Sequence, residues 1–91
     1  FLVAEALVYA AVAEGLERPV AERVVRQLLV GSALLLGREL DPVRLREQVT
    51  SPNGTTAAGV AMLEQHGLRA TIAAAVEAAT ARSRELAQRV P

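Results

Sequence analysis

The stretch TSPNGTTAAG, Thr50 to Gly59, gathers the residues of this 91-residue chain that are best suited to bind a small anion. It holds four hydroxyl groups, an asparagine, a proline and two glycines, whereas its surroundings are rich in Ala, Leu, Val and Arg. A turn of small residues that leads into a helix exposes backbone N–H groups that have no partner within the helix. These donors and the positive end of the helix dipole favour a carboxylate or a phosphate.

Individual residues in this stretch suit the same chemistry. Gly54 allows a ligand to approach the main chain, and the hydroxyls of Ser51, Thr55 and Thr56 can add directional hydrogen bonds. The residues alone leave a second and commoner interpretation open, because Ser and Thr before a helix are ordinary caps and Asn53-Gly54 is an ordinary turn that tolerates positive φ. The stretch has no Lys and no GxxxxGKS/T pattern, which argues against a nucleotide P-loop.

Helices are the elements that must position this stretch, since no segment alternates with the period of two residues that is typical of a strand. Asp41-Pro42 predicts a helix start, with Asp at the N-cap and Pro at the first helical position. Gly15 and Gly67 are predicted to end the helices before them. The sequence therefore predicts that residues 1–91 form one all-α domain, a bundle of about five helices. The expected helices cover residues 1–15, 19–36, 42–49, 55–67 and 68–89.

The chain has more apolar residues than one small globule can hide, because it is 52% hydrophobic with only 2% aromatic residues. The first helix is apolar on nearly all sides and is expected to be buried on nearly all sides. The stretch LLVGSALLLG, residues 28–37, has no charge, so we expect it at the centre of an assembly. The last helix places apolar or small residues at steps of four or three, with an outward Glu85–Arg89 pair, as in a coiled coil. These seam residues are Leu68, Ile72, Val76, Ala79, Ser83, Leu86 and Val90.

Composition argues against several classes of protein. Ten basic and ten acidic residues give no net charge, whereas a nucleic-acid binder needs a basic surface. There is no cysteine, and one histidine with scattered carboxylates gives no metal-ligand spacing. The apolar runs 1–13 and 28–37 are too short to cross a bilayer, and no basic residues precede the first run as in a signal peptide. A cytoplasmic location is expected, and the start at Phe1 without Met suggests a piece of a longer protein.

The segment VTSPNGTTAAGVAMLEQHGLRATIAAAVEAATARSREL, Val49 to Leu86, resembles the signature region of the pyrroline-5-carboxylate reductase family. The family pattern there is a Ser/Thr pair, Pro, two small residues of which the second is Gly, one further residue and Thr, then a helix that ends in LE..G. The upstream segment FLVAEALVYAAVAEGLERPVAERVV resembles the first helices of that family's C-terminal domain. The resemblance covers essentially the whole chain, and its one departure is Asn53, where most members carry Gly.

The resemblance implies a C-terminal domain that interleaves its helices with a second copy in a homodimer, and possibly in a higher oligomer. In the full-length enzyme an N-terminal Rossmann domain binds NAD(P)H, and the reaction reduces 1-pyrroline-5-carboxylate to L-proline, the last step of proline biosynthesis. This chain has no GxGxxG motif, so no cofactor binding and no reduction are expected from it alone. The preference between NADH and NADPH would be set outside it.

The same resemblance assigns roles within the stretch. Thr56 falls on the threonine whose hydroxyl faces the ring nitrogen, and is the expected catalytic contact. Ser51 and the backbone N–H groups at Gly54, Thr55 and Thr56 fall where the substrate carboxylate is held. A threonine hydroxyl is a poor general acid, so water or an already protonated iminium stays open as the proton source.

For three other residues we expect structural rather than catalytic roles. His66 is expected to cap a helix C-terminus or lie at the surface, Glu5 to have a structural partner, and Tyr9 to fill the core. Two alternatives to the reductase remain open from the sequence. One is a stand-alone helical oligomerisation module with a Ser/Thr-capped turn, and the other is a related imine or hydroxy-acid dehydrogenase tail with another substrate.

Overall fold

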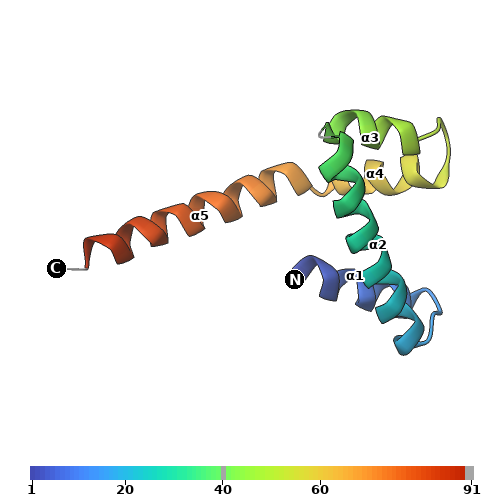
Figure 1. The fold of residues 1–91 in the computed structure, drawn as a ribbon, viewed down its shortest axis with the longest axis horizontal. Coiled ribbons are helices and arrows are strands. Elements are labelled where there is room, and N and C mark those ends of the chain that lie inside the picture. Colours follow the sequence, from blue (N-terminus) through green and yellow to red (C-terminus); the bar gives the residue numbers. More distant parts are fainter. Residues whose placement is uncertain (40, 90–91) are drawn as a thin grey trace. The chain divides into compact units, whose positions relative to one another are not determined.

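The computed structural model describes residues 1–39 and 41–89, which form five helices and no strand (Figure 1). The all-α class predicted from the sequence is therefore confirmed for the described residues. The chain divides into two compact units, Phe1–Arg46 and Glu47–Pro91, and the division falls within α3. The helices are α1 (Leu2–Ala13), α2 (Arg18–Glu39), α3 (Pro42–Val49), α4 (Thr55–Gln65) and α5 (Leu68–Gln88).

Two glycines end helices as the sequence predicts. Gly15 adopts φ +113° after α1, where its N–H donates to Val12 O at 3.0 Å and the next N–H, of Leu16, donates to Ala11 O at 3.1 Å. This pair of hydrogen bonds is the Schellman motif, which satisfies carbonyls at a helix end. Gly67 adopts φ +74° between α4 and α5 and donates to Glu64 O at 3.1 Å.

The helix boundaries follow from local chemistry with one difference. Asp41 caps α3 as expected, because its Oδ1 accepts a hydrogen bond of 3.0 Å from the N–H of Val43. Helix α2 instead runs to Glu39, three residues beyond the expected end at Leu36. Gly37 lies within this helix and is not among the glycines with positive φ, so it lowers helix propensity by about 1 kcal/mol without ending the helix.

The first unit contains the buried residues of the described chain, and there are only two. Ala21 is 0% exposed and Val25 is 4% exposed, both on the face of α2 that packs against α1. On α1 the half-buried positions recur at helical spacing, so one stripe of this helix contacts α2 and the rest is exposed. Burial of α1 on nearly all sides is thus not achieved within one chain. The half-buried residues of α1 are Ala4, Leu7, Val8 and Ala11.

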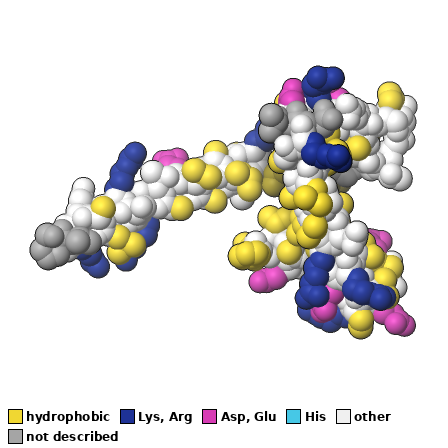
Figure 2. Space-filling view, viewed as in Figure 1, with side chains coloured by type: hydrophobic (Ala, Val, Ile, Leu, Met, Phe, Trp, Pro, Cys, Tyr) yellow, Lys and Arg dark blue, Asp and Glu magenta, His cyan; other side chains and the backbone are white. Residues whose placement is uncertain are grey.

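The second unit has no buried residue in α4 or α5. The two helices contact each other around Gly67, and an ion pair of 2.8 Å between Glu64 and Arg69 spans the turn. Apolar side chains lie at the surface along α5 (Figure 2). Glu85 forms its ion pair with Arg82 at 2.9 Å rather than with Arg89, so the expected i,i+4 pair is wrong and an i,i+3 pair replaces it.

Candidate anion-binding site

The Ser51 loop, residues 50–56, connects α3 to the first turn of α4 and lies within the second unit (Figure 1). Its first N–H, of Thr50, donates to Glu47 O at 3.3 Å, and the N–H of Gly54 donates to Ser51 O at 3.1 Å. Between them Asn53 adopts φ +60°, a left-handed conformation that Asn tolerates better than most residues. Two backbone hydrogen bonds and one left-handed residue thus define the turn.

The space around Gly54 is restricted, although its own φ of −84° is one that any residue can adopt. A Cβ atom at this position would lie 2.5 Å from Ser51 Oγ and 3.2 Å from Ser51 O. The serine side chain therefore lies directly over the glycine. Any larger residue at position 54 would displace the serine hydroxyl, the backbone turn or both.

The N-cap of α4 distinguishes between the two interpretations of this loop, which are an anion-binding site and an ordinary capping turn. The N-cap residue is Gly54, and no side chain makes a cap hydrogen bond there. The first hydrogen bond of the helix runs from the N–H of Ala58 to Gly54 O at 3.1 Å. The N–H groups of Thr55, Thr56 and Ala57 therefore precede the first intrahelical donor. Because the N-cap residue is a glycine, an ordinary cap by a serine or threonine at that position does not account for these hydroxyls.

The surroundings of the loop suit an anion. No charged residue occurs from Gln48 to Leu63, and the carboxylate that follows, of Glu64, is paired with Arg69. The positive end of the α4 dipole is therefore opposed by no acidic side chain of its own segment. Ser51, Thr55 and Thr56 are exposed, and Gly54 is half-buried.

A shallow hollow of about 390 Å³ adjoins the loop. Its floor is made by small side chains of α4, so the backbone of the first turn is open to a ligand. Of the predicted site residues only Gly54 lines this hollow, whereas Ser51, Thr55 and Thr56 border the same turn without lining it. The lining residues are Asn53, Gly54, Ala57, Ala58 and Ala61.

His66 has the structural role that the sequence predicts. It is the C-cap of α4, and its Nδ1 lies 3.1 Å from Met62 O, the carbonyl one turn earlier in the helix. The side chain is exposed. A histidine here thus contacts an end-of-helix carbonyl, which is the favourable place for a donor or a cation.

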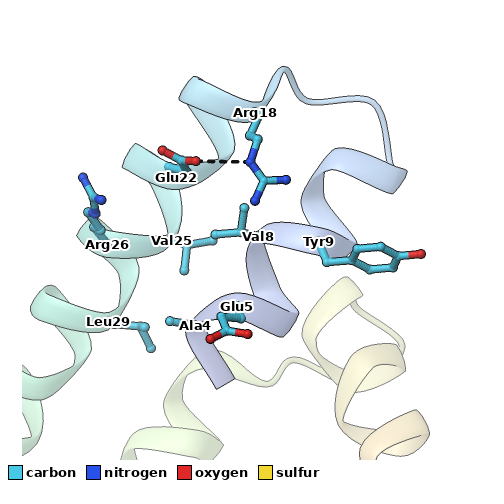
Figure 3. A pocket seen from close by; sticks show the side chains of 9 residues that line it. All are labelled: Ala4, Glu5, Val8, Tyr9, Arg18, Glu22, Val25, Arg26 and Leu29. Carbon is cyan, nitrogen blue, oxygen red and sulfur yellow. Dashed lines mark ion pairs between the residues drawn. The ribbon is translucent and has the colours of Figure 1, made fainter. Parts of the chain in front are cut away.

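A second concavity of about 510 Å³ lies between α1 and α2 in the first unit (Figure 3). Val8 and Val25 meet at its floor, and an ion pair of 3.3 Å joins Arg18 and Glu22 at its rim. This pair was not among the ion pairs expected from the sequence, although its i,i+4 spacing on a helix is the signal that predicts one. Glu5 also lines this concavity.

Tyr9 is not a core residue in this chain, because its side chain is 77% exposed and points away from α2 (Figure 3). The prediction of core filling is therefore wrong within the single chain. The apolar spacing of α1 is so nearly continuous that it does not distinguish the stripe facing α2 from the remaining faces.

Residues 1–39 and 41–89 hold no group of three or more His, Cys, Asp or Glu side chains placed to share a metal ion. Over the same residues, no helix combines the length and the hydropathy needed to traverse a bilayer.

Comparison with known proteins assigns residues 1–86 to a family model described as pyrroline-5-carboxylate reductase dimerisation. Pyrroline-5-carboxylate reductase 3 of Bos taurus is 47% identical over 85 residues, which cover 92% of this chain and 28% of the relative. Pyrroline-5-carboxylate reductase of Synechocystis is 44% identical over 89 residues, covering 97% of this chain and 33% of the relative. The chain thus spans about a third of the length of the curated relatives that it matches.

A solved structure shows the same fold. The crystal structure of Plasmodium falciparum pyrroline carboxylate reductase with NADP bound matches with a TM-score of 0.87 at 35% sequence identity. The match covers 92% of this chain and 34% of that one.

Proposed function

Because the chain belongs to the pyrroline-5-carboxylate reductase dimerisation family, we propose that it pairs with a second copy of itself and holds the substrate of that reductase in the Ser51 loop. In the complete enzyme this serves the reduction of 1-pyrroline-5-carboxylate to L-proline. The observation that carries the proposal is the loop itself: helix-start donors without a side-chain cap, surrounded by hydroxyls and free of acidic residues.

Pairing is supported by the apolar surface of the chain. Leu34, in the uncharged part of α2, is 67% exposed, and Val76, in the middle of α5, is 60% exposed. A helical domain with only two buried residues among those that the structure describes has too little core to offset the entropy lost on folding. A second copy that covers these faces supplies the missing burial, and interleaved helices would do so most fully.

The substrate carboxylate fits the first turn of α4. The N–H groups of Thr55 and Thr56 point toward the start of the helix and can donate to one carboxylate, with the Ser51 hydroxyl as a further donor. Charge-assisted bonds of this kind are stronger than neutral ones. Fixing the carboxylate orients the ring, so that one face of its C=N bond is presented for reduction.

We assign to Thr56 the contact with the imine nitrogen of the substrate. Its hydroxyl donates a hydrogen bond to that nitrogen, where electron density increases as the neighbouring carbon is reduced. The hydroxyl's own pKa is too high for efficient proton transfer, so its role is to orient the ring or to hold the water that supplies the proton.

The residues of this chain do not fit a dinucleotide site. The sequence has no GxGxxG motif, and the described residues have no strand to carry one. We therefore place NAD(P)H binding outside these 91 residues and assign no step of cofactor binding to them. A cytoplasmic location and assembly beyond the dimer remain predictions.

The proposal is tested by comparing Thr56→Ala with Thr56→Ser in the full-length protein. Loss of the hydroxyl removes one hydrogen bond to the reacting centre, so Thr56→Ala should lower kcat about 10–100-fold while the dimer persists. Thr56→Ser keeps the hydroxyl and should retain most of the activity. Equal kcat for the alanine and serine variants would remove Thr56 from the reaction, and failure of the unmodified protein to reduce any cyclic imino acid would refute the function itself.

A further inference from the structure

Asn53 is the only asparagine of the chain, and it is followed directly by a glycine. Its side chain is exposed, and Asn53 and Gly54 together line the shallow hollow beside α4. Gly54 has no side chain to crowd its own backbone nitrogen. We propose that Asn53-Gly54 is a self-modification site, at which the asparagine is converted to aspartate and isoaspartate through a cyclic imide.

The reaction needs only the chain and water. The backbone nitrogen of Gly54 attacks Cγ of Asn53, a C–N bond forms, and the bond from Cγ to the side-chain nitrogen breaks. Ammonia leaves with the proton lost by the Gly54 N–H, and a five-membered succinimide remains. Water then adds to either carbonyl of the ring and breaks one of its two C–N bonds, giving aspartate or isoaspartate.

The hydrogen bonding of the turn determines when the Gly54 nitrogen can attack Asn53 Cγ. In the structure the N–H of Gly54 donates to Ser51 O at 3.1 Å, so the proton that must be lost is engaged in a hydrogen bond. The reaction therefore proceeds when the turn opens, and a ligand that holds the turn closed should slow it. A larger residue at position 54 would disturb the loop itself, because a Cβ there would lie 2.5 Å from Ser51 Oγ and would displace that hydroxyl.

A substitution of Asn53 can prevent this reaction without disturbing the turn. The residue there adopts φ +60°, which glycine adopts at no steric cost. Asn53→Gly should therefore keep the turn and remove the reactive amide. Asn53→Gln should also react far more slowly, because its longer side chain must close a six-membered ring.

The consequence for binding rests on the proposed function. Aspartate or isoaspartate at position 53 would be the first charge between Gln48 and Leu63, and it would stand beside the donors assigned to the substrate carboxylate. Isoaspartate would also lengthen the main chain by one carbon within the turn. Both products should therefore weaken substrate binding by repulsion between like charges.

The chemical step is tested by incubating the full-length protein in mildly alkaline buffer and digesting it with trypsin. Cleavage after Arg46 and Arg69 releases the peptide 47–69, which contains Asn53. We expect this peptide to gain the mass of an amide-to-acid exchange and to become a substrate of isoaspartyl methyltransferase, in the wild type but not in Asn53→Gly. An unchanged native peptide, under conditions where the same protein in denaturant is converted, would overturn the proposal.

The effect of the modification on substrate binding is measured in a second experiment, through the KM for pyrroline-5-carboxylate. Asn53→Asp should raise KM for pyrroline-5-carboxylate by about tenfold relative to Asn53→Gly, and bound proline should slow the modification of the wild type. Equal KM values would refute the link to substrate binding. If instead the protein reduced no cyclic imino acid, the proposed function would fail while the mass measurement still decided the chemical step.

Discussion

At position 54 a single hydrogen atom takes the place of a side chain, and the geometry of the Ser51 loop depends on it. The Ser51 side chain occupies the space in which a Cβ would lie. The backbone N–H of Gly54 also closes the turn, because it donates a hydrogen bond to Ser51 O. One glycine therefore holds both the serine hydroxyl and the start of α4 in the positions that the proposed carboxylate site requires.

Gly54→Ala should raise KM for the substrate by about tenfold or more, because relieving the contact moves Ser51 or opens the turn, with a loss of one to three hydrogen bonds. Gly59→Ala is the matched control in the same helix, since a Cβ there meets nothing within 4 Å. The control should leave KM unchanged and support the helix by up to about 1 kcal/mol. Steady-state kinetics of the two full-length variants make the comparison, and indistinguishable KM values would contradict the role of Gly54.

At the scale of elements, α5 is the helix that most clearly needs a partner. It has 21 residues and none of them is buried. Most helical stability in proteins comes from tertiary packing of an apolar face rather than from helix propensity. The steps of four and three along the seam of α5 give it such a face, on which Val76 lies near the centre.

Val76→Lys should weaken self-association at least about tenfold, because it removes an apolar side chain whose burial contributes about 1.5–3 kcal/mol and adds a charge to the contact. Ala74→Lys provides the control, since it adds the same charge two residues away on the other side of the helix. Sedimentation equilibrium of both variants gives the two dissociation constants. If Ala74→Lys weakened association as much as Val76→Lys, the seam would be wrongly placed.

The sequence allowed the elements to be predicted well, for reasons that lie in particular residues. Gly15, Gly67 and Asp41 act over a few neighbours, so their effects on helix ends can be inferred without the rest of the fold. The continuation of α2 through Gly37 to Glu39 could not be inferred, because glycine permits a helix to continue as well as to end. Tyr9 was misassigned because an almost wholly apolar helix carries no pattern that marks its exposed side.

The site was predictable in part. The small polar stretch and its place before a helix were evident from residue types, whereas the absence of a side-chain cap on α4 depends on which residue becomes the N-cap. That residue is Gly54 rather than a serine or threonine, and this follows from the turn geometry around Asn53. Roles for Ser51, Thr55 and Thr56 remain predictions that the kinetic variants test.

At the scale of the whole molecule, large apolar side chains lie mainly at the surface of the described residues. Among the residues whose burial the structure describes, only Ala21 and Val25 are buried, while large apolar residues from every helix are exposed. Exposed apolar patches of this extent mark interaction surfaces. For an obligate pair, folding and association are one equilibrium, so the thermal midpoint of the chain should rise with protein concentration.

Sedimentation equilibrium of the 91-residue chain, read together with its circular dichroism, measures whether this domain folds only when it associates. If the chain is a dimerisation domain, the folded, helical species should sediment as a dimer or a larger assembly, and dilution should reduce helicity as the assembly dissociates. A monomer that stays fully helical and unfolds cooperatively at low concentration would contradict the account.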